Sequence, residues 1–450
     1  MREGARVQAV IELLDLINAS LQSSGAAADQ IIQSFFRSRR YAGSKDRRAI
    51  REHVYGLLRD LGRLRFLADA VGLPGDGRSL ALLDLALADP GGYSEAVRQI
   101  CADPHAPDPL DDDEHEQIRK ALARSDDVPT GAQLNVSERI LAFAEDRFSI
   151  HAERALRALN QRAPSVLWAP AAEDDRRKVM ATLAKEGITA ARGAWSPYAL
   201  SLRDTQTALS PAVINSLAPH AHLQDESSQL AAFFTCTGKG AKILDLCAGA
   251  GGKTLAIARQ LNRGTIVAAD VSASRLKTLQ ERVSAAKLSS AVEIFTETLS
   301  PDLDAPPPHG WASEFDGVLV DAPCTGSGTW RRNPEARWRY FDQDIVRFQA
   351  LQLSLCEKAV GFLRPGGRLV FATCSWFAEE TVQVVSKLSA KSSCLGAASM
   401  NSAQAKLWRA LRAQQNVVDT QDLENALQMM PHSHGTDGFF IAIFEKTVAA

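Results

Sequence analysis

From residue 241 onward, apolar stretches with strand character alternate with amphipathic stretches that have helical spacing. AKILDLCAG is a buried strand that ends at glycines, and TLAIARQL follows it as a helix. The same order recurs in GTIVAADVS and ASRLKTLQERVSAA, and further strands are VEIFTE, FDGVLVDAPC, GGRLVFATCS and GFFIAIFEK. Strands that alternate with helices form right-handed crossover units and a mainly parallel sheet. We therefore predict an α/β domain in the C-terminal half.

The N-terminal part of the chain carries helical spacing and no strand signal. Its first apolar stripe consists of Val7, Val10, Ile11, Leu14, Ile17 and Leu21, which predicts an all-α bundle. Residues 103–116 contain three prolines and seven acidic residues, a composition typical of a solvated loop. Short helix and strand patterns between these parts indicate a small α/β element. We predict three domains: 1–135 (helical), 136–222 (small α/β, linking) and 223–450 (α/β).

The charge of the chain is uneven along its length. The formal net charge is −2, which by itself argues against a nucleic-acid partner. Residues 1–70 carry 12 basic and 8 acidic side chains, whereas residues 71–150 carry 7 and 16. The remaining 300 residues carry 32 basic and 29 acidic side chains. One acidic segment therefore masks two mildly basic regions, and a nucleic-acid partner stays possible.

Cysteine usage and hydropathy indicate the compartment of the protein and exclude some protein classes. The chain has seven cysteines and no Cys-x-x-Cys pair, which argues against structural zinc and a disulfide framework. No apolar run is long enough to span a membrane, and the N-terminus lacks the pattern of a secretory signal. We expect a cytoplasmic protein in a reducing environment. His432 and His434 have no further ligand types near them in the sequence, so we expect no metal.

The segment LDLCAGAGGKT at 244–254 lies at a strand-to-helix turn, where glycines let a ligand approach the backbone. A phosphate-binding P-loop would need glycine at Cys247, and a dinucleotide fingerprint would need glycine at Thr254. S-adenosylmethionine, which has no phosphate, tolerates the pattern. Asp245 could then face its cationic methionine end, and Asp270 could accept both ribose hydroxyls. A purely structural glycine turn is the alternative.

Two cysteines follow two predicted strands. Cys324 lies in DAPCTGSG after FDGVLV, and Cys374 lies in TCS after RLVFA. Ligands of open α/β sheets bind beyond the carboxyl ends of the strands, so both thiols are placed at the reactive edge with the glycine turn. Either cysteine alone could be a small buried apolar residue. Cys247 lies in the turn itself, where its backbone could touch the ligand and its side chain is better explained by packing.

Several longer motifs carry a family resemblance. These are LQDESSQ, LDLCAGAGGKT, AADVSASRL, DAPCTGSGTWRRNPEARW, LRPGGRLVFATCSWFAEE and HGTDGFFIA, which cover roughly residues 195–450. With the paired PC and TC cysteines, this half resembles the Sun/Fmu family of RNA (cytosine-5) methyltransferases. The N-terminal third, with FFRSRRYAGSKDRRAIREHVYGLLR, is similar to the NusB-like helical domain of the bacterial small-subunit rRNA members.

The resemblance implies a fold, a cofactor and a chemistry. The fold is a NusB-like helical domain, a small linking domain and a Rossmann-like class I methyltransferase domain that uses S-adenosylmethionine. The chemistry is methylation of a cytosine carbon 5, in which the TC cysteine, Cys374, attacks carbon 6 and the PC cysteine, Cys324, assists product release. In DNA cytosine-5 methyltransferases the PC cysteine attacks instead, so spacing alone leaves the two roles open.

The resemblance also implies further site residues. Asp321 would hydrogen-bond the base edge, and Lys253 would be a further contact in the active site. The alternatives are a turn cap for Asp321 and a solvated helix-start lysine for Lys253. The residues expected around the cofactor are Asp245, Cys247, Ala248, Gly249, Ala250, Gly251, Gly252, Lys253, Asp270, Arg275, Glu297 and Asp321. Glu297 stands where the family usually has aspartate, and Leu167–Pro170 replaces the usual Arg-x-Asn.

Two basic segments suit a nucleic-acid partner, because cations contact phosphates and aromatic rings stack on bases. One comprises Trp330, Arg331, Arg332, Arg337, Trp338, Arg339 and Tyr340; the other comprises Arg37, Arg39, Arg40, Lys45, Arg47, Arg48 and Arg51. Solvated surfaces or a partly buried tryptophan are the alternatives. We expect a monomer that methylates 16S rRNA, with tRNA as the alternative substrate. A non-catalytic, RNA-binding ribosome-assembly factor is the alternative class.

Overall fold

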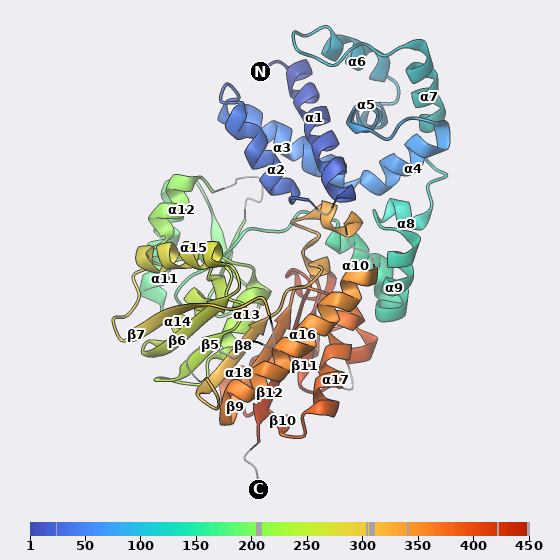
Figure 1. The fold of residues 1–450 in the computed structure, drawn as a ribbon. Helices are drawn as coiled ribbons and strands as arrows, with labels where there is room; N and C mark the ends of the chain where they lie inside the picture. Colours follow the sequence, from blue (N-terminus) through green and yellow to red (C-terminus); the bar gives the residue numbers. More distant parts are fainter. Residues whose placement is uncertain are drawn as a thin grey trace. The chain divides into compact units, whose positions relative to one another are not determined.

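A computed structural model describes residues 1–23, 25–203, 209–302, 305, 311–339, 342–420 and 423–447. The chain divides into two compact units, one of residues 1–161 with 330–340 and one of residues 162–329 with 341–450. Figure 1 shows the helical character of the first unit and the sheet of the second. The three-domain division with limits at 135 and 222 stays a prediction. Among the described residues, no helix is both long and apolar enough to cross a bilayer.

The first unit is all helical, as the spacing of its apolar residues predicts. Its described α-helices are α1 (Glu3–Gln22), α2 (Ala28–Ser38), α3 (Ser44–Arg59), α4 (Leu61–Val71), α5 (Gly77–Ala88), α6 (Tyr93–Cys101), α7 (Asp112–Ala123), α8 (Thr130–Gln133), α9 (Glu138–Phe148) and α10 (Ala152–Leu159). Helix α1 packs against α3 and α5. All six residues of the predicted stripe on α1 are buried in one apolar cluster.

The expectation of a solvated loop over residues 103–116 is wrong in its second half. Helix α7 begins at Asp112, directly after an N-cap residue, Asp111, whose side chain accepts from the Glu114 backbone N–H at 2.7 Å. The Glu114 carboxylate reaches back to the Asp111 N–H at 3.1 Å and completes a capping box. The acidic run therefore starts a helix, because carboxylates are favourable near the positive end of the helix dipole.

The second unit begins with a small antiparallel sheet in the order β2-β3-β1-β4. Its elements are β1 (Val166–Trp168), α11 (Glu173–Lys185), β2 (Ala190–Arg192), β3 (Ala199–Leu202), α12 (Pro211–Leu217) and β4 (His222–Leu223). Trp168, in the segment that departs from the family pattern, is buried and stacks on Tyr198 and His222. Segment 167–170 thus contributes to the core of this sheet.

The larger sheet has the strand order β10-β12-β9-β8-β5-β6-β7, with β11 paired to β12. Its strands are β5 (Lys242–Asp245), β6 (Gly264–Asp270), β7 (Val292–Thr298), β8 (Phe315–Asp321), β9 (Leu363–Thr373), β10 (Leu395–Ala397), β11 (Ala426–Met429) and β12 (Phe439–Lys446). Strands β5 to β9 pair in parallel, whereas β12 runs antiparallel to β9. The predicted α/β fold is confirmed.

Helices cover both faces of this sheet. They are α13 (Glu226–Thr235), α14 (Gly252–Leu261), α15 (Ala273–Ala285), α16 (Asp342–Phe362), α17 (Val382–Lys391), α18 (Ser402–Arg412) and the short α19 (Pro431–His434). On β9, Leu369 and Phe371 pack in the cluster of α16 and α17, whereas Val370 and Ala372 pack in that of α13 and α14. This period-two alternation buries residues 367–373 of β9 on one face of the sheet or the other.

Candidate active site

Two thiols meet at the carboxyl ends of adjacent strands. Strands β8 and β9 are parallel partners, with Asp321 opposite Ala372 in the register. Cys324 lies three residues beyond the end of β8, and Cys374 directly follows β9. Their Sγ atoms are 3.3 Å apart, and both side chains are half-buried. The sheet thus brings together the two cysteines that the sequence places 50 residues apart.

The thiol of Cys374 is held in its protonated form in this arrangement. Its hydrogen bond with Cys324 raises the pKa of Cys374 well above the ordinary value, and burial and the charge of Asp321 raise it further. The ammonium group of Lys253 opposes this and lowers the pKa. Because the thiolate is the nucleophilic form of cysteine, the lysine favours the reactive state.

Lys253 and Asp321 form an ion pair beside the cysteines. Helix α14 carries Lys253 in its first turn, and the Nζ atom lies 2.6 Å from Asp321 Oδ2 at the end of β8. The ammonium group also lies 5.2 Å from the centre of the Phe439 ring. Burial works to lower the pKa of Lys253, but the charge and hydrogen bond of Asp321 more than offset it. The lysine therefore stays charged although its side chain is only 12% exposed.

The glycine turn joins β5 to α14 through two residues with positive φ, Gly249 and Gly251. A Cβ atom on Gly251 would lie 2.5 Å from the Leu279 side chain, so this position requires glycine. A Cβ atom on Gly249 would meet no atom within 4 Å, which leaves open space above the turn. Ala248 is buried against α15, and Ala250 is exposed while its carbonyl accepts from Arg282.

Two carboxylates flank this turn. Asp270, at the end of β6, is buried and accepts from the backbone N–H groups of Gly249 at 2.9 Å and Ser272 at 2.8 Å. Asp245, at the end of β5, is fully buried; its Oδ2 atom accepts from Thr254 at 2.7 Å, and its Oδ1 atom has no hydrogen-bond partner among the described residues. Burial raises the pKa of Asp245 to about 7. An unsatisfied buried acceptor of this kind is costly without a ligand.

A buried glutamate connects the two loops that carry the cysteines. The Glu380 side chain has no exposed surface, and its carboxylate accepts from the backbone N–H of Thr325 at 2.9 Å and from the Thr325 hydroxyl at 2.5 Å. The Ser375 hydroxyl donates to it at 2.6 Å, and the Gln352 amide donates at 3.2 Å. Thr325 directly follows Cys324, and Ser375 directly follows Cys374.

Comparisons with known proteins show the family of the chain. The sequence model of the family described as 16S rRNA methyltransferase RsmB/F matches residues 237–445. The chain is 30% identical over 314 residues to ribosomal RNA small subunit methyltransferase B of Pectobacterium carotovorum, a match that covers 68% of this chain and 65% of that protein.

This chain belongs to the RsmB/F methyltransferase family.

Two further proteins match over nearly the whole chain. The enzyme of the same name from Vibrio cholerae is 26% identical over 98% of this chain and 96% of its own length. The first relatives are matched over a shorter part: the chain spans just under two thirds of the Pectobacterium protein. The crystal structure of PH0851 matches 99% of both chains with a TM-score of 0.72 at 22% identity, which shows the fold. The predicted family and fold are confirmed.

The other predicted cofactor residues of this RsmB/F chain differ in burial and position. Glu297 is half-buried on β7, opposite Ala269 of β6, and therefore lies beside Asp270 at the same sheet edge. Arg275 is exposed on the first turn of α15. The Cys247 side chain packs partly buried against the cluster of β8 and α16, as expected, and burial raises its pKa well above the ordinary value. The cofactor roles of these residues stay predictions.

The expectation that residues 330–340 form an RNA groove is wrong for its central residues. Trp330, Arg331 and Arg337 are 2%, 7% and 6% exposed. The guanidinium of Arg337 lies over the Trp330 ring and donates to the backbone carbonyls of Asn135 and Leu159 at 3.2 Å each. Their cationic and aromatic groups are thus used inside the first unit. Tyr340 lies outside the described residues.

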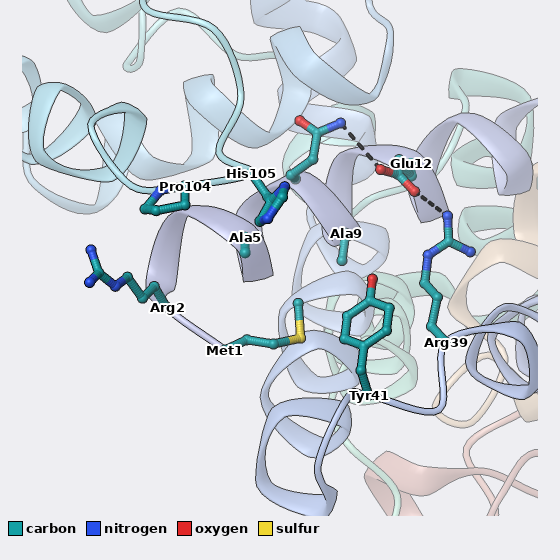
Figure 2. Close-up of a pocket in the computed structure, with 10 residues that line it drawn as sticks. Met1, Arg2, Ala5, Ala9, Glu12, Arg39, Tyr41, Pro104 and His105 are labelled. Atoms are coloured by element: carbon teal, nitrogen blue, oxygen red, sulfur yellow. Dashed lines mark hydrogen bonds and ion pairs between the residues drawn. The ribbon is translucent and has the colours of Figure 1, made fainter.

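The second basic segment is only partly exposed. Arg37, Arg40, Lys45, Arg48 and Arg51 are exposed, whereas Arg39 and Arg47 are half-buried. Figure 2 shows Arg39 at a pocket of about 620 Å³, where its guanidinium pairs with Glu12 at 2.6 Å. The same guanidinium lies 3.7 Å from the centre of the Phe35 ring. The ion pair shares this pocket with apolar side chains and with the polar side chains of Tyr41 and His105.

His434 is a structural residue. It is buried, and its ring nitrogens lie within hydrogen-bond distance of the Leu411 carbonyl at 3.0 Å and the Ser433 hydroxyl at 2.8 Å. Burial lowers the pKa of His434, so the ring is neutral at pH 7. In the part of the chain that the structure describes, no three His, Cys, Asp or Glu side chains are grouped to hold a metal.

The sequence reasoning missed Glu380, Gln352 and Phe439. Glu380 stands in the family-like stretch at 363–380, so its presence in a motif was a signal. Its chemistry was hidden, because a Glu in WFAEE reads as one of two exposed carboxylates beside a turn. Gln352 and Phe439 come from α16 and β12, which only the folded sheet brings to this edge.

Proposed function

We propose that this chain transfers a methyl group from S-adenosylmethionine to carbon 5 of a cytosine in 16S rRNA through a covalent adduct on Cys374. The observation that carries this proposal is the meeting of the Cys324 and Cys374 sulfur atoms at 3.3 Å beside the charged Lys253–Asp321 pair. The names of the curated relatives support small-subunit rRNA as the substrate.

The residues at the glycine turn fit the proposed cofactor. The open space above Gly249 would admit a ligand close to the backbone, and the unpaired Oδ1 atom of Asp245 would face a cationic group. Asp270 accepts one backbone N–H on each oxygen and keeps lone pairs for ribose hydroxyls. S-adenosylmethionine, when bound, supplies an electrophilic methyl group.

Cys374 would act as the nucleophile. Its sulfur would add to carbon 6 of the cytosine and transfer electron density to carbon 5, which is otherwise a poor nucleophile. After carbon 5 has taken the methyl group, a base takes its proton, the electron pair re-forms the double bond between carbons 5 and 6, and the sulfur of Cys374 leaves carbon 6 as a thiolate. Cys324, in contact with Cys374, would assist this release. The base must be single-stranded or turned out of a helix, so that the thiol can reach carbon 6 and the methyl donor can reach carbon 5.

Asp321 would recognise the base in this step, and Lys253 would favour the thiolate of the nucleophile. The Asp321 carboxylate keeps one oxygen, Oδ1, that is not used in the ion pair and can accept from the cytosine amino group. Lys253 places a positive charge near Cys374 and favours its thiolate. We infer that the pair links recognition of the base to activation of the nucleophile.

The test incubates the protein and tritiated S-adenosylmethionine with small-subunit rRNA from cells that lack the gene. We expect label in 5-methylcytosine, no turnover with Cys374→Ala, and an RNA adduct that survives denaturing electrophoresis with Cys324→Ala. Cys101→Ala, in the first unit, is the matched control and should behave as the unaltered protein. An adduct that forms without Cys374 would reverse the two roles.

The substrate arm uses tRNA in place of rRNA under the same conditions. Label in tRNA alone would replace the rRNA assignment by the tRNA alternative. RNA binding without incorporation into either RNA, and without measurable S-adenosylmethionine binding, would favour an assembly factor over an enzyme. The intact thiol pair argues against that alternative, since RNA binding alone gives no reason to bring two thiols together.

A further inference from the structure

Beyond the sheet, backbone hydrogen bonds and a side-chain connection join the two cysteine-bearing loops. The parallel ladder of β8 and β9 ends at Asp321 and Ala372, before either cysteine is reached. Beyond it, the Ala322 N–H donates to the Ala372 carbonyl at 3.0 Å and the Gly328 N–H donates to the Cys374 carbonyl at 2.9 Å. The thiol–thiol contact itself is weak, because sulfur is a poor donor and a poor acceptor.

The carboxylate of Glu380 supplies that connection. It accepts two hydrogen bonds from Thr325, the residue after Cys324, and one from Ser375, the residue after Cys374. Gln352 adds a fourth donor, and the same amide group donates to the Pro323 carbonyl at 2.9 Å. We call Glu380, Thr325, Ser375 and Gln352 the Glu380 network. Both cysteines thus have a neighbour bonded to one carboxylate.

The four donors use the whole acceptor capacity of an ionised carboxylate, which accepts about four hydrogen bonds and donates none. No ion pair of Glu380 occurs among the described residues, and its side chain is fully buried. Burial raises the pKa of Glu380, while the hydrogen bonds from Ser375, Thr325 and Gln352 oppose this. An anion kept in the interior by neutral donors alone requires those donors to stay in place.

The hydroxyl groups of Ser375 and Ser327 add further hydrogen bonds between the two loops. Ser375 donates to the carboxylate, so its oxygen is an acceptor for the Ser327 hydroxyl at 2.9 Å and for the Phe377 N–H at 3.1 Å. The Ser327 oxygen accepts from the Trp376 N–H at 3.0 Å. Each loop therefore donates to the other through short, buried side chains that have few rotamers to lose.

We propose that Glu380 is a positioning residue that sets the distance between the sulfur atoms of Cys324 and Cys374. It contacts neither sulfur and acts through Thr325 and Ser375. As a determinant of methyl transfer this inference rests on the proposed function, whereas its effect on the thiol pair can be measured without any substrate.

The substrate-free test uses phenylarsine oxide, which forms two As–S bonds with a close pair of thiols and releases one water. We expect the unaltered protein to bind one equivalent that withstands a monothiol competitor, as read by intact mass. Cys324→Ser gives the background from the other cysteines. Glu380→Gln places an amide N–H₂ group among other hydrogen-bond donors. This variant should bind the arsenical at least about tenfold more weakly than the unaltered protein.

The matched control is Glu379→Gln, the same chemical change at the neighbouring half-buried carboxylate. It should bind the arsenical as the unaltered protein does. Thr325→Val removes one hydroxyl donor and keeps the backbone N–H, so a smaller loss in the same direction is expected. If Glu380→Gln does not fold, Thr325→Val decides, and unchanged arsenical affinity of that variant overturns the proposal.

A kinetic measurement separates positioning from mere structural support. In folded Glu380→Gln we expect kcat for methyl transfer to fall at least about tenfold while the Kd for S-adenosylmethionine stays unchanged. Unchanged kcat together with unchanged arsenical binding would overturn the inference. Absence of methyl transfer in the unaltered protein would refute the proposed function alone, since the arsenical result would still report the thiol distance.

Discussion

Residues 321–329 and 330–339 are consecutive in the chain, yet they belong to different compact units. The first stretch follows β8 and consists of small and polar residues around Cys324, whose side chains bond to neighbouring loops. The second stretch carries arginines and tryptophans that are bonded inside the helical unit. The chemically modest stretch carries Cys324, one of the two thiols that meet at the sheet edge, and the strongly charged stretch is structural.

The difference teaches that residue type alone does not assign a role. Arg337 has the cation expected of an RNA contact, but its guanidinium donates to two backbone carbonyls and lies over an indole ring. Glu335 likewise accepts from the Ala28 N–H at the start of α2 at 3.1 Å. These bonds fix residues 330–339 within the helical unit.

The largest expected effect tests the structural stretch. Trp330→Ala should lower the free energy of unfolding by about 3–5 kcal/mol, since a fully buried indole leaves a cavity when truncated. Urea denaturation followed by circular dichroism measures it. Trp338→Ala is the control, with a smaller loss expected because this ring is half-buried. Equal losses below about 1 kcal/mol in both variants would show that the stretch is a surface after all.

The next effect tests Lys253, which pairs with Asp321 at the start of the first stretch. Its charge lowers the pKa of Cys374, so Lys253→Met should raise that pKa and reduce the thiolate fraction at every pH below it. A rise of one pKa unit would slow methyl transfer about tenfold near neutral pH and move the pH–rate profile to the alkaline side. Lys239→Met, an exposed lysine before β5, is the control. A uniform loss of rate with an unshifted profile would contradict the electrostatic role.

The smallest effect concerns the exposed basic residues of α3. Lys45→Gln should weaken RNA binding by less than about 1 kcal/mol and reduce the salt dependence of binding by about one phosphate contact. Binding titrations at several salt concentrations measure both quantities. Lys120→Gln, also exposed in the helical unit, should leave them unchanged. If RNA affinity depends equally on salt concentration in the unaltered protein, Lys45→Gln and Lys120→Gln, then RNA does not contact Lys45.

Much of the catalytic half was predictable because short-range patterns carry it. Continuous apolar stretches that alternate with helical stretches predicted the strands of the large sheet, and the glycine turn predicted a ligand edge after β5. Placement of both cysteines at strand ends predicted that they would be close. The hydrogen-bonded start of α7 at Asp112 was missed, because a capping box reads in composition as an acidic loop.

By itself the sequence determined the alternation of strand and helix, the all-helical N-terminal unit and the family. Local spacing and turn chemistry act over a few residues and are visible in the chain. Only the tertiary structure decided that Cys324 and Cys374 touch, that Glu380 bonds both of their loops, and that Arg337 is buried. These facts depend on contacts between residues far apart in sequence, and burial changes what a charged side chain does.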